Sequence, residues 1–259
     1  MKKVVLIALI PCLSVQAEEV VSSNGVSFYA GASMVSSWTS SDFKMDYTVD
    51  NFFDIKNPGS NHKKNSIGRV GVEFAAGVKK KFSNDWFVGS ELNYTLSRAT
   101  HDHDFNEIEA GETPEDTADT DRISFIQIKH GDEIGISFKF GKEFKCYEVY
   151  GILGATTKQV KIKYGLDGTN ALITGNAFEI NPKKRVWGAV FGLGGSKKIT
   201  DKISCSLEYK YKLYNSAKKS IDCRGASSDA FGADHDTSDR NFKVKSDKHE
   251  LSLGVTFNI

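Results

Sequence analysis

Residues 248–259 read Lys-His-Glu-Leu-Ser-Leu-Gly-Val-Thr-Phe-Asn-Ile and are the last twelve residues of the chain. From Leu251 to Ile259, apolar residues alternate with Ser, Gly, Thr and Asn. An alternation with a period of two residues is typical of a β-strand that has one apolar and one polar face. We therefore predict a strand here, and we expect it to close the structure that the earlier strands build.

Seven earlier stretches show the same alternation. Short turn sequences separate some of them, whereas long polar stretches follow the first, third, fifth and seventh. This order predicts eight antiparallel strands, with all short turns at one end and four long loops at the other. The predicted strands cover residues 25–35, 68–80, 86–97, 134–140, 147–164, 185–199, 203–214 and 248–259, and the predicted loops cover residues 36–67, 99–122, 165–184 and 215–247.

Two strands have an ambiguous phase. In 147–164, Tyr150 and Val160 share one parity while Leu153 has the other, and a β-bulge near Gly154 would reconcile them. The strand 134–140 could begin as early as residue 123, because residues 126 and 128 are isoleucines that keep its phase.

The two faces of these strands differ in bulk. One face carries Phe, Leu, Val, Ile, Tyr and Trp, and the other is rich in Gly, Ser and Thr with isolated charges. The interior of an eight-stranded barrel is just wide enough for side chains to fill it. The bulky face does not fit there, so a transmembrane barrel with that face toward lipid is favoured over a soluble barrel with an apolar interior.

The isolated charges of the polar face are then predicted to point into the lumen. Charges in a narrow lumen need partners, since desolvation would otherwise neutralise them. We interpret them as a structural network of ion pairs that plugs the barrel, and the alternative is a gated ion path. The predicted network consists of Arg69, Glu73, Glu91, Lys139, Glu208 and Lys210.

The N-terminus has the pattern of an export signal. Lys2 and Lys3 precede an apolar run from Val4 to Val15, and Ala17 provides a small residue at the cleavage site. We predict a signal peptide at residues 1–17 and a barrel domain at residues 18–259. The run is too short for a membrane-spanning helix, which needs about 20 apolar residues. The formal net charge of +1 gives no global basic field for nucleic acid.

The leader, the glycine-rich alternating strands such as Gly188–Gly195, and the short and long order of the loops resemble the small outer-membrane barrels of Gram-negative bacteria, the OmpA-type transmembrane and opacity-porin families. The resemblance implies short turns in the periplasm and long loops outside the cell. It also implies contact with outer-membrane lipid and recognition of the last strand by the barrel-assembly machinery. That signal would comprise Leu253, Val255, Phe257 and Ile259, although the last residue in these families is usually aromatic.

Other chemistry is weakly indicated. Residues 101–104 (His-Asp-His-Asp) and 234–236 (Asp-His-Asp) contain metal-ligating residue types, but adjacent spacing in an acidic loop favours a solvated loop. His249 and Glu250 point to opposite faces of one strand, and no serine can be placed beside them. We therefore expect no metal, no cofactor and no enzymatic activity.

The four loops then carry the expected function. Loops on a rigid scaffold commonly bind partners, so we expect a surface protein with a structural, adhesive or antigenic role that reaches a host or surface receptor through its loops. The alternatives are a small-solute porin and, third, an outer-membrane hydrolase.

Overall fold

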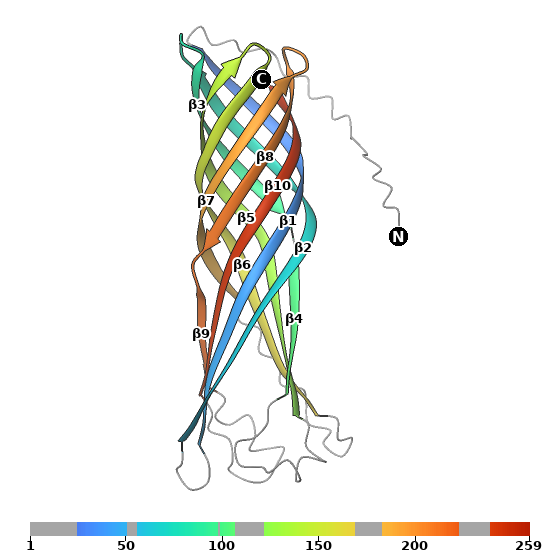
Figure 1. Ribbon diagram of the computed structural model, residues 1–259, viewed down its shortest axis with the longest axis vertical. Coiled ribbons are helices and arrows are strands. Elements are labelled where there is room, and N and C mark those ends of the chain that lie inside the picture. Colours follow the sequence, from blue (N-terminus) through green and yellow to red (C-terminus); the bar gives the residue numbers. More distant parts are fainter. Residues whose placement is uncertain (1–24, 51–55, 98, 107–121, 169–182, 223–238) are drawn as a thin grey trace, which may run out of the picture.

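The computed structural model describes residues 25–50, 56–97, 99–106, 122–168, 183–222 and 239–259. These residues form one closed antiparallel sheet (Figure 1). Its strands are β1 (Val26–Asp50), β2 (Lys56–Lys81), β3 (Trp86–Leu96), β4 (Ala99–Asn106), β5 (Arg122–Phe144), β6 (Tyr147–Gly168), β7 (Lys183–Lys198), β8 (Ile203–Tyr214), β9 (Ala217–Asp222) and β10 (Asp239–Asn258). Within the described ranges, no helix is long and apolar enough to cross a membrane.

The ten strands make an eight-stranded barrel. β4 follows β3 after two residues and pairs with β5, as β3 does, while β9 follows β8 after two residues and pairs with β10, as β8 does. β3 and β4 are therefore two segments of one barrel strand, and so are β8 and β9. Every other strand pairs with its sequence neighbours, so the predicted up-and-down architecture is confirmed.

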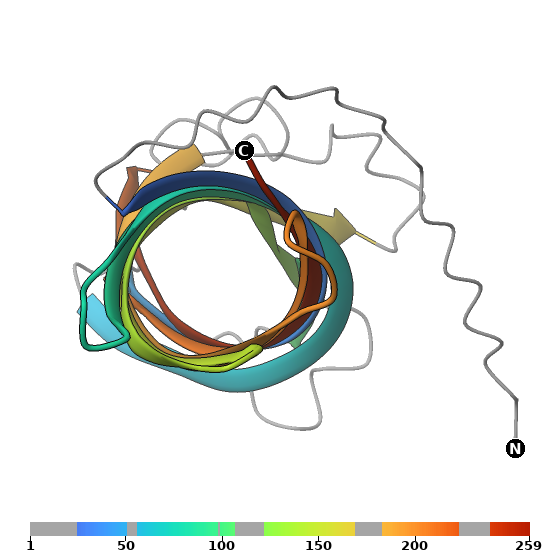
Figure 2. The same ribbon diagram turned by 90° about the horizontal axis from the view of Figure 1, so that it is seen from above.

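The last strand closes the barrel, as its alternation predicts. β10 pairs with β8 on one side and with β1 on the other, from Tyr29↔Asn258 to Thr48↔Asp239. The view along the barrel shows the resulting closed ring (Figure 2). Where every strand has two partners, closure leaves no edge of unpaired backbone groups, which is what a lipid environment requires. Toward the long-loop end, β2 before Val72, β4 and β9 each have one partner strand in the described sheet.

The three short turns lie at one end, called here the short-turn end, which is drawn at the top of Figure 1. They separate β2 from β3, β5 from β6, and β7 from β8, as the sequence predicts. Asp85 and Lys145 have positive φ angles of 64° and 54°, which these tight reversals require. At the opposite end, called here the long-loop end, the strands run on toward the residues outside the described ranges.

The strands are much longer at the long-loop end than the sequence indicates. Residues 36–67 are predicted as a loop, but β1 continues to Asp50 and β2 begins at Lys56. Parts of the other three predicted loops also form strands, namely β4, residues 165–168 of β6, the first two residues of β7, β9 and the start of β10. A transmembrane strand needs about 9–11 residues, so strands of 25 and 26 residues project far beyond a bilayer.

The expected bulge lies in a different strand. β6 keeps one register through Gly154, and its even-numbered residues from Glu148 to Ile162 face the lumen. The register shift is in β5, between His130 and Glu133. The prediction of a bulge near Gly154 is therefore wrong. The shift also places Ile128 inside the barrel although Ile134 faces outward, so these residues do not share a phase.

Glycines of β7 make room for long lumen side chains. A Cβ atom at Gly194 would lie 2.5 Å from the Tyr150 ring and 3.0 Å from Cγ of Glu208. Gly195 points to the other face, and its Cβ would meet only a backbone oxygen at 3.3 Å. Position 194 therefore needs glycine for space, whereas position 195 does not.

We predict that Gly194→Val destabilises the barrel by about 1–3 kcal/mol, the usual cost of overpacking, and lowers the folded fraction. Gly195→Val is the matched control and should fold as the unsubstituted protein does. Heat-modifiable gel migration after refolding into lipid vesicles measures both. Equal yields for the two variants would contradict the lumen packing described here.

Candidate functional site

Five of the six predicted lumen charges meet in one cluster, called here the inner cluster. Lys139 Nζ lies 2.7 Å from a carboxylate oxygen of Glu91 and 2.7 Å from one of Glu208. Lys210 Nζ lies 2.9 Å from Glu208 and 2.6 Å from Glu73. These five residues come from β2, β3, β5 and β8. The Lys139–Glu208 and Lys210–Glu73 pairs cross the interior of the barrel, whereas Lys139–Glu91 joins neighbouring strands and Lys210–Glu208 lies within β8.

Neutral donors complete the inner cluster. The hydroxyl groups of Tyr150 and Tyr29 donate to Glu208 at 2.8 Å and to Glu91 at 3.2 Å. Thr95 Oγ1 donates to Glu73 at 2.9 Å. Buried carboxylates are tolerated when charge pairs and hydrogen bonds occupy their lone pairs, and here both contribute.

Arg69, the sixth predicted residue, lies elsewhere. Its side chain is exposed toward the long-loop end and makes no ion pair with any described residue.

A second set of ion pairs, called here the outer cluster, lies nearer the long-loop end. Lys212 and Lys248 each contact both Glu133 and Glu250, at 2.9–3.0 Å. Sequence reasoning did not single out this cluster as a site. The signal was present, because Lys212 and Glu250 have the same lumen-facing parity as Lys210 and Ser252 in their strands.

Lys158 of β6 is buried beside the outer cluster without joining it. It is 1% exposed, and its Nζ has no hydrogen-bond partner. Its ammonium group lies 3.6 Å from the centroid of the Tyr214 ring, which is a cation–π contact. Away from the rim of the short-turn end, the described lumen thus carries six lysines and six glutamates, but one lysine is compensated only at longer range: Lys79, Lys139, Lys158, Lys210, Lys212, Lys248, Glu73, Glu91, Glu133, Glu148, Glu208 and Glu250.

Beyond the outer cluster, the interior becomes apolar. Phe43 and Phe242 are 0% and 2% exposed, with ring centroids 6.1 Å apart. Side chains from β5 to β9 surround them, and we call this group the apolar layer. Its members are Phe43, Ile128, Val160, Ile162, Val186, Tyr214, Ala217, Phe242 and Val244.

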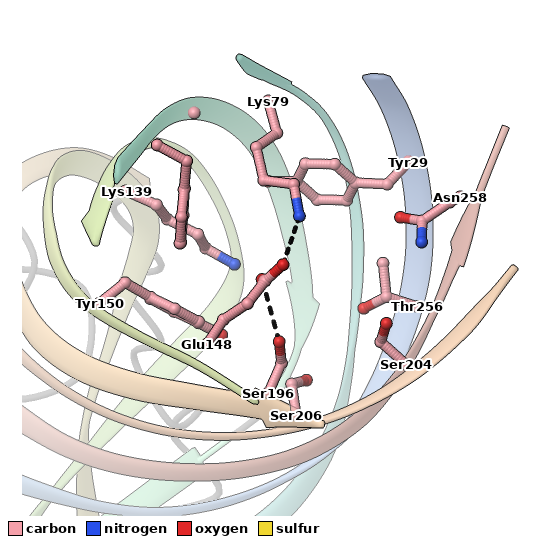
Figure 3. Close-up of a pocket in the computed structure, with 12 residues that line it drawn as sticks. Tyr29, Lys79, Lys139, Glu148, Tyr150, Ser196, Ser204, Ser206, Thr256 and Asn258 are labelled. Carbon is pink, nitrogen blue, oxygen red and sulfur yellow. Dashed lines mark hydrogen bonds and ion pairs between the residues drawn. The ribbon is translucent and has the colours of Figure 1, made fainter. Parts of the chain in front are cut away.

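The short-turn end instead opens into a polar vestibule (Figure 3). Lys79 and Glu148 form an ion pair of 2.6 Å across it, and Ser196 donates to Glu148 at 3.0 Å. Lys139 of the inner cluster also lines this space. The vestibule therefore ends at the first set of ion pairs.

The outward face of the barrel carries large apolar side chains in a continuous belt. Leu92, Leu153, Leu193 and Leu253 are each 61–69% exposed. Aromatic residues lie at both edges of the belt, including Trp86 at the short-turn edge and Trp187 near the long-loop edge. Trp86 stacks on Phe140 at 4.9 Å, and Lys142 Nζ lies 5.9 Å from the Trp86 ring.

Such a surface would be unstable in water, whereas an apolar band with aromatic edges around a polar interior matches a lipid bilayer. The chain is an eight-stranded β-barrel of the outer-membrane type. The alternative of a soluble barrel with an apolar interior is excluded for this belt, because the large apolar side chains point away from the lumen.

Comparisons with known proteins find a likeness of fold only. No protein-family model matches the chain, and no curated protein matches it. Among solved structures, the outer-membrane protein OprG of Pseudomonas aeruginosa is 16% identical, with a TM-score of 0.47, over 88% of this chain and 96% of that one. The attachment invasion locus protein Ail of Yersinia pestis is 13% identical, with a TM-score of 0.33, over 87% of this chain and 98% of that one. The outer-membrane protease OmpT of Escherichia coli is 11% identical, with a TM-score of 0.45, over 89% and 97%.

The residues of the predicted assembly signal lie on the lipid-facing side of this outer-membrane barrel. Leu253 and Phe257 are 63% and 48% exposed, and Val255 shares their parity. Ile259 is 39% exposed, and its backbone N–H donates to the carbonyl of Phe28 at 2.8 Å. Recognition by the assembly machinery stays a prediction.

His249 has neighbours that the sequence did not reveal. As predicted, it faces outward while Glu250 is buried in the lumen. Its Nδ1 lies 2.7 Å from the Tyr209 hydroxyl, its Nε2 lies 3.9 Å from Asp247, and its ring packs 4.7 Å from the Tyr211 ring. This group sits at the long-loop edge of the belt, where amphipathic rings are commonly found.

The two metal candidates lie where the structure describes no side chains. Residues 101–104 belong to β4, and residues 234–236 lie outside the described residues. Within the part of the chain that the structure describes, no three metal-ligating side chains gather.

We predict that Lys210→Met destabilises the barrel by about 3–5 kcal/mol, because it leaves Glu73 and Glu208 buried without this counter-charge. Lys158→Met is the matched control, since it also removes a buried lumen lysine. It should cost little or stabilise the protein, because Lys158 has no hydrogen bond to lose. Urea unfolding in lipid vesicles, followed by tryptophan fluorescence, measures both. Equal losses would show that the cross-lumen pairs are not what stabilises the interior.

Proposed function

We propose that this protein is a non-conducting outer-membrane barrel that displays its long-loop end at the cell surface, in an adhesive or antigenic role. The observation that carries the proposal is the obstructed lumen. Two clusters of cross-lumen ion pairs and an apolar layer follow one another along the axis. A porin needs a continuous water-filled path, and these three layers argue against one.

The location follows from the lipid-facing belt and from the predicted signal peptide at residues 1–17, which lies outside the described residues. We place the barrel in the outer membrane of a Gram-negative cell, delivered after cleavage of that signal and inserted by the barrel-assembly machinery. The proposal includes no enzymatic step, cofactor or nucleic acid. A host or surface receptor would contact the long-loop end.

Strand length supports display. β1 and β2 pair from Val26↔Lys80 to Asp50↔Lys56, well past the last lipid-facing residues. This hairpin and the outer parts of β5, β6 and β10 raise the long-loop end away from the bilayer (Figure 1). A raised rigid base suits contact with another surface, because loops on a rigid scaffold lose less entropy when they bind.

We predict that the purified barrel in planar bilayers gives no large, stable conductance steps, because charged and apolar side chains block the lumen. A porin measured under the same conditions is the positive control. The competing channel function draws its support from the polar vestibule at the short-turn end. Reproducible open steps of single-channel size would favour the channel function and would contradict the proposal that the lumen is blocked.

We predict that deleting residues 107–121 and 223–238 abolishes binding of barrel-expressing bacteria to host cells while the barrel still assembles. Binding is counted per cell at equal surface expression, and heat-modifiable migration verifies assembly. The Lys158→Met variant serves as a control with intact loops. Unchanged binding after deletion would remove the adhesive role.

A further inference from the structure

Along β10, the outward and inward faces exchange polarity at the edge of the belt. On the outward face, Leu251 and Leu253 are followed toward the long-loop end by Lys245 and Lys243, both exposed. On the inward face, Glu250 gives way to Val244 and Phe242 of the apolar layer. Beyond the belt, the barrel thus has an apolar core and a charged surface, as a protein in water does. We call this projecting part the collar.

Three lysines of the collar stand in a row across neighbouring strands, called here row A. Lys243 of β10 is paired directly with Lys44 of β1 on one side and with Lys218 of β9 on the other. All three side chains are exposed. His62 of β2 extends the row, because it pairs with Lys44.

A second row, row B, lies on other strands of the collar. Lys161 of β6 is paired with Lys129 of β5 and with Lys183 of β7. Lys183 is exposed and the other two are partly exposed, while the neighbouring Ile128 and Ile162 point inward. The same arrangement therefore occurs twice around one barrel.

Directly opposed residues have Cβ atoms about 4.5–5.5 Å apart, and like charges in such pairs destabilise a sheet. Among the acids whose side chains are described, one contacts a row lysine and two contact histidines. Asp46 pairs with Lys44 at 3.0 Å, but Asp42 and Asp247 contact His62 and His249. The described collar carries eleven exposed or partly exposed basic residues against four acidic ones: Lys44, Lys64, Arg69, Lys129, Lys161, Lys183, Lys184, Arg185, Lys218, Lys243 and Lys245 against Asp42, Asp46, Asp132 and Asp247.

We propose that rows A and B bind the phosphate or sulfate groups of an anionic glycan, each row contacting several groups at once. The placement of the rows on the proposed cell-surface side of the barrel rests on the proposed function. Lysines about 5 Å apart can share the oxygens of one such group or contact neighbouring groups. A bound polyanion would remove the repulsion within each row and add a charge-assisted contact for each lysine.

The position of the rows favours the glycan portion of a membrane glycolipid or a free glycan over the bilayer surface itself. Lys183 lies four residues beyond Trp187 at the edge of the belt, and Lys243 lies eight residues beyond Leu251. At about 3.3 Å per residue along a tilted strand, row B stands roughly 10 Å and row A roughly 20 Å beyond the apolar belt. Sugars carrying phosphate or sulfate groups reach these heights from either source.

The test uses the full barrel in an uncharged detergent or in vesicles of zwitterionic lipid. Two probes distinguish the sources: inositol hexakisphosphate as a soluble polyphosphate, and a core-phosphorylated glycolipid incorporated in the vesicles, with its dephosphorylated form as control. Calorimetry or native mass spectrometry measures binding to Lys44→Gln/Lys218→Gln/Lys243→Gln (row A), to Lys129→Gln/Lys161→Gln/Lys183→Gln (row B), and to Lys80→Gln/Lys145→Gln/Lys202→Gln. The last variant removes the same charge at the short-turn end.

We expect each row variant to weaken binding at least tenfold, the short-turn variant to leave it unchanged, and salt to weaken it in all proteins. Without ligand, the row variants should have equal or higher thermal midpoints, because repulsion is relieved.

Binding to the glycolipid alone would identify a membrane source, and binding to both probes would identify the anionic group itself. No binding to either probe, or an equal loss in the short-turn variant, would overturn the proposal. So would lower midpoints without binding, which would show that acids of the chain itself neutralise the rows. In that case, conductance and loop-deletion results would still stand as tests of the proposed function.

Discussion

The pairing of β10 with β1 is the constraint on which the rest of the structure depends. In hydrocarbon, each backbone N–H and C=O group must find a partner within the protein, and an open edge would leave a row of them unpaired. The contact from Tyr29↔Asn258 to Thr48↔Asp239 removes that edge over its whole length. Once eight strands are closed in this way, alternate side chains have to point into a narrow interior.

That forced interior gives a structural reason for the many buried charges. A narrow lumen surrounded by lipid can be filled by apolar side chains or by paired charges, and charges are tolerated only where their partners are close. Lys139 and Lys210 each pair with two carboxylates, one of them across the barrel, and Gly194 leaves the space that Tyr150 and Glu208 occupy. The charges and the glycine thus follow from one steric requirement.

The sequence predicts those parts of the molecule where one face meets lipid. Strand order, the three short turns, the facing of Leu253 and the lumen positions of Glu73 and Lys210 all follow from apolar–polar alternation. The alternation gives no strand signal in residues 36–67. Ser37 and Ser41 line the interior while Ser40 and Asp42 face water, so both faces of β1 are polar there. The bulge in β5 also leaves no signal, because isoleucines lie on either side of it with opposite orientations.

The exchange of faces along one strand shows what such alternation measures. The backbone of β10 keeps the same pairing with β1 from end to end, yet its apolar residues move from the outward face at Leu251 to the inward face at Val244. The strand itself has not changed; the medium outside it has changed from lipid to water. Lysine rows are tolerable only on the water side, where solvent and counter-ions screen like charges. Independently of the apolar belt, the lysine rows therefore indicate that this part of the barrel lies beyond the bilayer.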